Sequence, residues 1–128
     1  SPQMKEILLV AIGGGLGACA RYSLTGFIAV RTATIKFPVG TFAVNVIGCL
    51  VAGLIIGIAE SKNVLTPSLR LFLTTGLLGG FTTYSAFGVE TAALIKKGDV
   101  FTAALYVIST VIVALIAFWA ANTAIRSA

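Results

Sequence analysis

Histidine is absent from this chain, and acidic side chains are scarce. The only carboxylate side chains are those of Glu6, Glu60, Glu90 and Asp99. General acid–base catalysis and metal-assisted chemistry depend largely on imidazole and carboxylate groups, so the chain offers little for either. The two cysteines, Cys19 and Cys49, lie within apolar stretches and have no partner at metal-ligand spacing, so we interpret both as inert packing residues. We expect a protein that is not an enzyme.

Charged residues of any sign are also few, at 10% of the sequence, whereas 58% of the residues are hydrophobic. The mean hydropathy of +1.05 lies far outside the range usual for soluble domains. The sequence predicts an all-α, multi-pass membrane protein with a single integral membrane domain over residues 1–128. No cleavable signal is recognisable before the first apolar stretch, which we expect to direct insertion itself. The expected helices cover residues 4–30, 38–59, 67–96 and 100–125.

The net charge of +5 comes from basic residues that are scattered over the ends of the spans, a distribution that does not favour nucleic-acid binding. With four spans, both termini lie on one side of the membrane. That side receives Lys5, Lys62, Arg70 and Arg126, and the other receives Arg31, Lys36, Lys96 and Lys97. This balance gives almost no preferred orientation under the positive-inside rule. We therefore expect two copies to pair in lipid as an antiparallel, dual-topology homodimer.

Small residues recur at four-residue spacing in the first two spans. In the first span Gly13 pairs with Gly17 in this pattern, and Gly14 pairs with Ala18. In the second span the corresponding residues are Gly48, Ala52, Gly53 and Gly57. Such spacing lets the backbones of neighbouring membrane helices approach closely. We expect a close-packing face on each of these two helices.

The third span is apolar over Leu71–Glu90, yet its centre is a poor helix. Gly79-Gly80 lowers helix stability, and the hydroxyl residues that follow offer the backbone competing hydrogen bonds. We expect a break near residues 79–83. An interrupted helix is tolerated in lipid only where it meets protein, lines a cavity or holds an ion, so the break is a candidate site. The alternative is a simple glycine kink whose backbone groups are satisfied by nearby hydroxyls.

Two antiparallel copies would bring their broken helices together at the centre of the bilayer. Carbonyl groups released near Gly79 and Thr82 of both chains would converge there, forming a seat for one desolvated monovalent cation. No carboxylate lies within a few residues of the break, which disfavours a divalent ion.

The polar atoms expected around this centre are mostly hydrogen-bond donors. They belong to Thr41, Asn45, Thr82, Thr83, Tyr84, Ser85, Tyr106 and Thr110. Phe87 follows Tyr84 at three-residue spacing, so both rings share one helix face and offer edges of positive partial charge. Donors and ring edges suit a small anion stripped of water. On the other hand, aromatic residues at this spacing often form ordinary core, and Asn45 could simply tie two helices together.

Two charged residues lie within or near the spans. Arg21 is costly at its depth unless it finds partners, and it is either a structural anchor to backbone carbonyl groups or part of an ion vestibule. Glu90 lies one turn beyond Phe87. It is either at a pore mouth, where it hydrogen-bonds with a donor, or a solvated carboxylate near the end of a helix.

Three motifs together resemble the Fluc (CrcB) family of fluoride channels along nearly the whole chain. They are GGGLGACARY over residues 13–22, GTFAVNVIG over residues 40–48 and GLLGGFTTYSAFGVE over residues 76–90. The resemblance implies a small dual-topology dimer of the bacterial plasma or inner membrane, with two narrow fluoride pathways and a central structural sodium ion. The implied sodium ligands are the main-chain carbonyl groups of Gly79 and Thr82.

The resemblance also implies roles for side chains along the fluoride pathway. It places Tyr84 and Phe87 at two aromatic positions of the pathway and Asn45 at the polar position of the second span. Tyr106 and Thr110 fall on a polar track in the fourth span, and we expect Thr41 and Ser85 beside the same pathway. The sequence departs from the family pattern at Tyr84, where Phe is usual, and at Ala86, where Thr is usual.

The function expected from this resemblance is passive, selective fluoride efflux that limits fluoride toxicity. One alternative is a small proton-coupled multidrug exporter, which needs a carboxylate within a span; Glu90 is the only intramembrane candidate. A second alternative is a non-conducting assembly subunit, which would explain the glycine faces but not a break lined by donors.

Overall fold

The computed structural model describes residues 2–128, and every regular element in that range is helical. The elements are α1 (Pro2–Arg31), α2 (Val39–Ser61), α3 (Pro67–Leu71), the π-helix η1 (Phe72–Leu78), α4 (Gly79–Phe81), α5 (Ser85–Lys96) and α6 (Val100–Ser127). The expectation of an all-α chain is confirmed over these residues.

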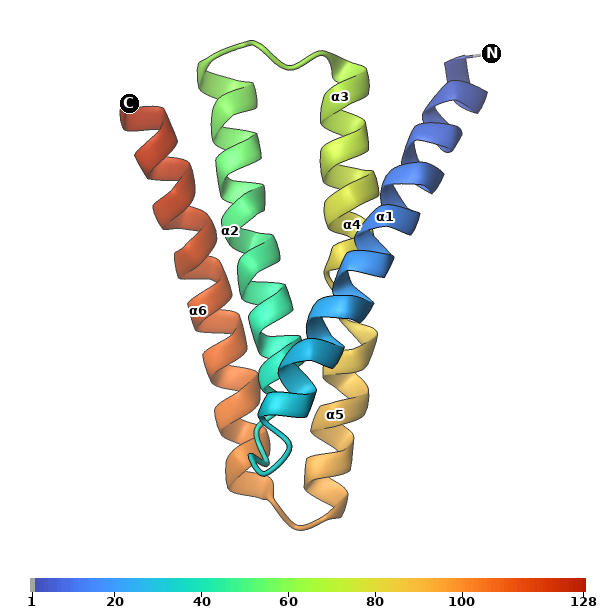
Figure 1. Ribbon diagram of the computed structural model, residues 1–128. Coiled ribbons are helices and arrows are strands. Elements are labelled where there is room, and N and C mark those ends of the chain that lie inside the picture. Colours follow the sequence, from blue (N-terminus) through green and yellow to red (C-terminus); the bar gives the residue numbers. More distant parts are fainter. Residues whose placement is uncertain (1) are drawn as a thin grey trace.

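Successive crossings alternate in direction, and both termini lie at the same end of the molecule (Figure 1). Three helices are long and apolar enough to cross a membrane: residues 3–31 of α1, and all of α2 and α6. The fourth crossing consists of α3, η1, α4 and α5, which follow one another along a bent path and are called the third span below. The chain therefore has the four-crossing arrangement expected from its hydropathy.

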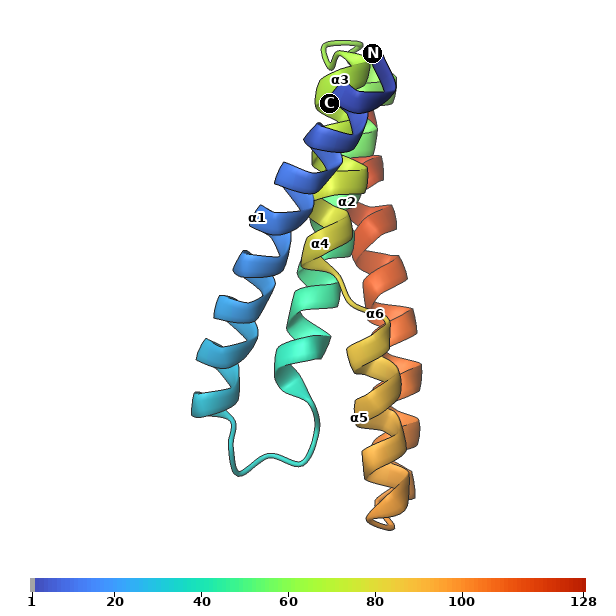
Figure 2. The same cartoon turned by 90° about the vertical axis from the view of Figure 1, so that its right-hand side faces the viewer.

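Helix α1 crosses the third span obliquely and diverges from the other helices toward the α1–α2 loop (Figure 2). The crossing depends on glycine. A Cβ atom on Gly13 would lie 2.9 Å from the backbone nitrogen of Leu77, and one on Gly17 would overlap the Leu77 carbonyl oxygen. The predicted close-packing face of the first span is confirmed, and it faces η1 and α4.

A second close contact joins α2 to α6. A Cβ atom on Gly57 would lie 3.0 Å from side-chain atoms of Ile125, and one on Gly53 would overlap the Phe118 carbonyl oxygen. The side chain of Asn122 also donates a hydrogen bond of 3.4 Å to the carbonyl oxygen of Gly53. The glycine face predicted for the second span is therefore a helix–helix contact.

The ends of the third span follow from local sequence. At its start, the Thr66 hydroxyl accepts a hydrogen bond of 3.1 Å from the Leu69 N–H, and Pro67 occupies the first helical position. At its end, Gly98 has a φ of +84°, and the Asp99 N–H donates 2.9 Å to the Leu94 carbonyl oxygen. Glycine accommodates this left-handed conformation without a Cβ penalty. Local sequence therefore accounts for both ends of the third span.

The break in the third span differs in one respect from the sequence expectation. Gly79 and Gly80 are helical, within α4, and the non-helical residues are Thr82, Thr83 and Tyr84. The break therefore falls on the hydroxyl residues at the end of the predicted range 79–83 and extends to Tyr84, while the two glycines stay helical. Gly80 instead provides room for α1, because a Cβ atom there would overlap the carbonyl oxygen of Gly14.

Few side chains are enclosed by the single chain. Tyr106 and Val44 are the largest fully buried residues, whereas Phe101 is 80% exposed and Trp119 is 68% exposed. Large apolar side chains on the outside of such a bundle suit contact with lipid or with a second protein chain.

Candidate functional site

The break in the third span is held by one asparagine of α2. The Asn45 Oδ1 atom accepts a hydrogen bond of 2.8 Å from the Thr83 N–H, and its Nδ2 atom donates 2.9 Å to the Thr83 carbonyl oxygen. The side-chain amide thus replaces both helical partners of the Thr83 backbone. The structure shows the helix-tying contact that sequence analysis left open for Asn45, and one N–H of its amide is not used in this pair.

The same hydrogen bonds release two main-chain carbonyl groups. In a continuous helix the Thr83 N–H would bond to the Gly79 carbonyl oxygen, but it bonds to Asn45 instead. The Ala86 N–H would likewise bond to the Thr82 carbonyl oxygen, but it bonds at 3.2 Å to the Thr83 hydroxyl. The carbonyl groups of Gly79 and Thr82 are therefore left without their helical partners.

Arg21 satisfies a third carbonyl group near the break. Its Nε atom donates a hydrogen bond of 3.1 Å to the carbonyl oxygen of Gly80. Gly80 lies in α4, just before the break. The contact links α1 to α4 across 59 residues of sequence. It is the contact expected of a structural anchor, and it accounts for a guanidinium group at this depth.

A partly buried hydroxyl–carboxylate pair lies between α5 and α6. The side chain of Tyr106 is fully buried, and its hydroxyl donates a hydrogen bond of 3.1 Å to the Glu90 Oε1 atom. This hydrogen bond fixes the orientation of both side chains. Glu90 therefore has the donor that sequence analysis proposed for it at a pore mouth.

Aromatic rings surround Tyr106 on several sides. The Phe37 ring meets it edge-on at 5.3 Å between centroids, and the Phe87 ring is tilted at 5.1 Å. Phe42 packs edge-on against Phe37 at 5.4 Å. These four residues are called the aromatic cluster below. The cluster consists of apolar rings. Ring edges carry positive partial charge, so they can still stabilise a negative charge beside them.

Buried hydroxyl groups continue the polar surface along α2 and α6. Thr41 is 5% exposed and Thr110 is 7% exposed, one helical turn beyond Tyr106. Within residues 2–128, the Thr110 Oγ1 atom is buried and has no hydrogen-bond partner. A buried hydroxyl without a partner costs about 1–3 kcal/mol, so this group is available to a ligand or to a second chain.

Two of the residues predicted for the pathway lie outside this buried region. Tyr84 is 86% exposed and stacks on Phe87 with ring centroids 5.9 Å apart. Ser85 is exposed at the start of α5, where its hydroxyl lies 3.5 Å from that of Thr83. In the single chain these side chains face outward, and only Phe87 joins them to the aromatic cluster.

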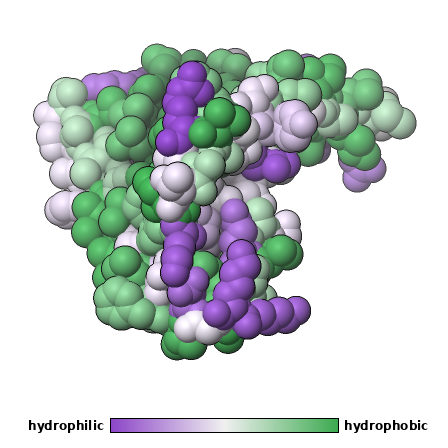
Figure 3. Space-filling model, turned by 60° about the horizontal axis from the view of Figure 1, so that its bottom comes forward, coloured by the Kyte–Doolittle hydropathy of each residue, from purple (hydrophilic) through white to green (hydrophobic). Residues whose placement is uncertain are grey.

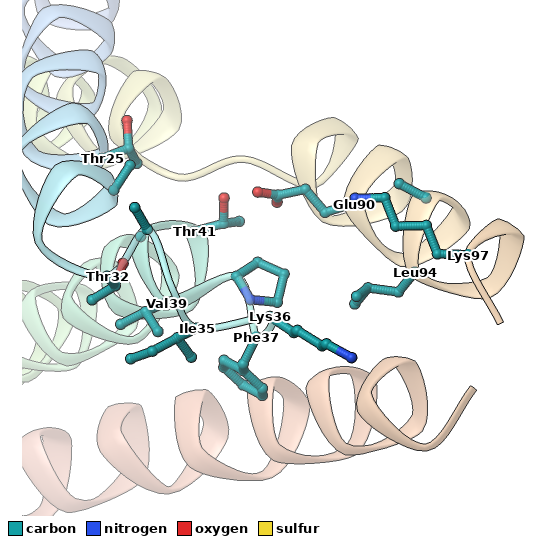
Figure 4. A pocket seen from close by; sticks show the side chains of 15 residues that line it. Thr25, Thr32, Ile35, Lys36, Phe37, Val39, Thr41, Glu90, Leu94 and Lys97 are labelled. Carbon is teal, nitrogen blue, oxygen red and sulfur yellow. The ribbon is translucent and has the colours of Figure 1, made fainter. Parts of the chain in front are cut away.

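A cavity of about 370 Å³ opens beside Glu90, and its polar lining comes from α1, α2, α5 and the loops that follow α1 and α5. Figure 4 shows the Glu90 carboxylate extending from α5 toward Thr41 of α2, with Thr25 and Thr32 on the opposite wall. Lys36 and Lys97 lie at the end nearest the loops. The cavity thus connects the loop end of the molecule with the carboxylate that is bonded to Tyr106. We call it the loop-end cavity.

Known proteins resemble this chain over nearly its full length. The family described as "CrcB-like protein, Camphor Resistance (CrcB)" matches residues 8–122. The chain belongs to the CrcB family.

Curated relatives of this CrcB chain carry the name "Fluoride-specific ion channel FluC". The protein of Methylobacillus flagellatus is 45% identical over 116 residues, which cover 91% of each chain. The protein of an Anaeromyxobacter species is 47% identical and covers 96% of this chain and 97% of the relative. That of Geobacter sulfurreducens is 44% identical over 96% and 98%. Together with the apolar helices, the family membership identifies a multi-pass bacterial membrane protein.

Two members of this CrcB site escaped the sequence analysis. Phe37 was treated as part of a short loop, although its ring packs on Tyr106, and Thr83 was grouped with other hydroxyl donors, although its backbone is the partner of Asn45. Phe37 directly precedes Pro38, the residue before α2, and an aromatic residue at such a junction is a usable signal for inward packing. No local signal pairs Thr83 with Asn45, since 38 residues separate them.

Proposed function

We propose that this protein is a passive fluoride-selective channel, through which fluoride leaves the cytoplasm so that its toxicity is limited. The relatives named as fluoride-specific channels support the ion and the mode of transport. A channel requires no energy-coupling site, and the short helical chain is fully used in building the membrane bundle.

The observation that carries the proposal is the pair of buried hydroxyl groups on α6, those of Tyr106 and Thr110. Tyr106 is enclosed by aromatic rings, and Thr110, one turn away, has a buried hydroxyl without a partner. A purely structural helix of this composition would place apolar side chains at both positions, because an unpaired buried hydroxyl is destabilising. Hydroxyl donors and ring edges are the groups with which a small anion replaces its hydration water.

In the proposed mechanism fluoride exchanges water for protein donors in successive steps. It enters through the loop-end cavity, passes the Glu90–Tyr106 pair and reaches the hydroxyl of Thr110, with the edge of Phe87 beside it. Tyr106 alternates between donating to Glu90 and donating to fluoride, so the donor is never left unpaired. A narrow, donor-lined path favours fluoride over chloride, which is larger and forms weaker hydrogen bonds.

The proposal includes a homodimer with antiparallel subunits in lipid. A single bundle leaves Tyr84 and many apolar side chains outside, and a second copy would cover part of this surface. In such a pair Tyr84 and Ser85, which face outward from one chain, would line a pathway shared with the partner. The balanced distribution of Lys and Arg between the two ends supports pairing in opposite orientations.

A structural sodium ion is part of the same proposal. The carbonyl groups of Gly79 and Thr82 fit it, because the hydrogen bonds of Asn45 and Thr83 release them from their helical partners. Four such carbonyl groups, two from each copy, suit a monovalent cation. When bound, the ion would hold the two broken helices together and neutralise their converging dipoles.

The decisive experiment is ion efflux from liposomes that contain the purified protein. Fluoride-loaded and chloride-loaded vesicles are compared, with valinomycin and potassium providing the compensating charge. Rapid loss of fluoride without loss of chloride is expected. Retention of fluoride by vesicles that contain folded dimers would contradict the channel function.

Glu90 provides a test against the proton-coupled exporter. Exchange of Glu90 for Gln keeps an acceptor for the Tyr106 hydroxyl but removes the proton-binding carboxylate. We expect cells producing E90Q to retain fluoride tolerance above that of cells without the protein. Proton-driven cation export that is lost in E90Q, together with fluoride tolerance that does not depend on the protein, would support the exporter.

A further inference from the structure

Two lysines line the mouth of the loop-end cavity, and they differ in their ion-pair partners. Lys36 comes from the α1–α2 loop and Lys97 from the end of α5, and both line the cavity. Viewed with this end brought forward, hydrophilic residues run through the middle of the surface and hydrophobic residues flank them (Figure 3). Ions approaching from water therefore meet the charged residues of the two loops before they reach Glu90.

The two lysines differ in their partners. The Lys36 Nζ atom lies 3.5 Å from the Asp99 Oδ1 atom, so its charge is partly offset by a neighbouring carboxylate. Lys97 has no ion-pair partner in the part of the chain that the structure describes, residues 2–128. Figure 4 shows its side chain extending back along α5 in the direction of Glu90. Lys97 is thus the cavity-lining lysine without a carboxylate ion-pair partner among residues 2–128, whereas the Glu90 carboxylate, deeper in the same cavity, accepts its hydrogen bond from Tyr106.

A charge at the entrance of a narrow pathway changes the local concentration of mobile ions. In water, one elementary charge within about 8 Å of the entrance raises the local concentration of a monovalent anion about two-fold at low ionic strength. Salt removes the effect, since the Debye length falls from about 30 Å at 0.01 M to about 3 Å at 1 M. The effect acts on entry and leaves the interior of the pathway unchanged.

We propose that Lys97 attracts anions to this mouth and accelerates fluoride entry, and that Asp99 limits the effect by pairing with Lys36. This inference rests on the proposed fluoride conduction. It assigns the two loops a role in determining the rate at low fluoride concentration, with no role in selectivity.

The test compares fluoride efflux of the full-length protein and its variants in liposomes, at fluoride concentrations well below saturation. At about 10 mM ionic strength, K97Q should reduce the rate about two-fold and K97E about four-fold, because reversal doubles the change in charge. D99N should raise the rate, as it removes the negative charge paired with Lys36. All of these variants should match the unmodified protein at about 1 M salt.

Lys96 supplies the matched control, because it is adjacent and exposed but does not line the cavity. K96E should change the low-salt rate less than K97E does. Equal effects of K96E and K97E, a decrease in D99N, or effects that persist at high salt would overturn the inference while leaving the channel function intact. Absence of fluoride efflux from the unmodified protein would instead remove the proposed function and the inference together.

Discussion

At the scale of single residues, polar side chains of the site form hydrogen bonds within the chain and still have a further hydrogen-bonding position. Asn45 holds Thr83 with its oxygen and one N–H, and the other N–H remains available. Tyr106 donates to Glu90 and is packed between the rings of Phe37 and Phe87. Structural and transport roles therefore need not exclude each other here, because each amide or hydroxyl group has more than one hydrogen-bonding position.

Exchange of Phe87 for Ile tests the aromatic contribution to conduction. Ile keeps the apolar volume approximately but removes the ring edge that lies beside Tyr106, so we expect fluoride efflux from liposomes to be lost. The dimer should persist, as judged by size-exclusion chromatography in detergent. Phe42 offers a comparison ring, because it belongs to the same cluster but its edge-on ring contact is with Phe37. Unchanged efflux in F87I would remove Phe87 from the pathway.

Exchange of Asn45 for Ala tests the clamp on the break. The Thr83 N–H and carbonyl groups would both lose their partner, at a cost of about 1–3 kcal/mol for each group left unsatisfied. We expect a lower unfolding temperature in detergent and a loss of fluoride efflux. Asn122 is a matched control, because it makes a single hydrogen bond of 3.4 Å to Gly53. A loss of stability in N122A as large as in N45A would contradict the clamp.

At the scale of the elements, the limits of the long helices could be predicted because local chemistry determines them. Gly98, in a left-handed conformation, follows the end of α5, and Thr66 with Pro67 begins α3. The position of the break could not be predicted in the same way. The sequence indicated residues 79–83, and within this range the helix stops only where Asn45, from a different span, replaces the backbone partners of Thr83. Sequence composition locates a weak helix, whereas a tertiary contact decides which residue leaves it.

The contact between α1 and the third span can be tested with two glycines of α1. Exchange of Gly17 for Ala would place a methyl group against the Leu77 carbonyl oxygen, so we expect destabilisation of about 1–3 kcal/mol from overpacking. Exchange of Gly15 for Ala is the control, because nothing lies within 4 Å of the new Cβ atom, and the better helix propensity of Ala should leave stability unchanged or raised. Thermal unfolding in detergent measures both. Equal stability of G17A and G15A would contradict the close crossing.

At the scale of the whole molecule, four crossings place the termini together and divide the charges evenly between the two ends. Composition was sufficient to predict the four crossings and the shared end of the termini, because hydropathy determines the spans; the orientation in the membrane stays a prediction. The aromatic cluster could not be predicted from them, because it combines Phe37 from a loop with rings from α5 and α6. Residues that meet only after folding carry no shared pattern in the sequence.

Dual topology is tested by labelling from one side of the membrane. In a background with Cys19 and Cys49 exchanged for Ser, a reporter cysteine replaces Ser127, an exposed and uncharged residue at the end that holds the termini. An impermeant maleimide applied to intact cells should label roughly half of the protein, since the balanced charges favour neither orientation. A reporter at the exposed Thr34, at the opposite end, should give the same fraction. Labelling of one reporter only would establish a single orientation.

The close crossing of α1 over η1 and α4 also has a consequence for membrane insertion. The glycine face of α1 meets the third span, so its contact with Leu77 is completed only by residues made some 60 positions after Gly17. The residues of α1 and α2 are therefore made before those that cover Gly13 and Gly17. The native packing of α1 cannot be completed until the third span is present, so a chain that ended after α2 would leave this glycine face uncovered by its native partner.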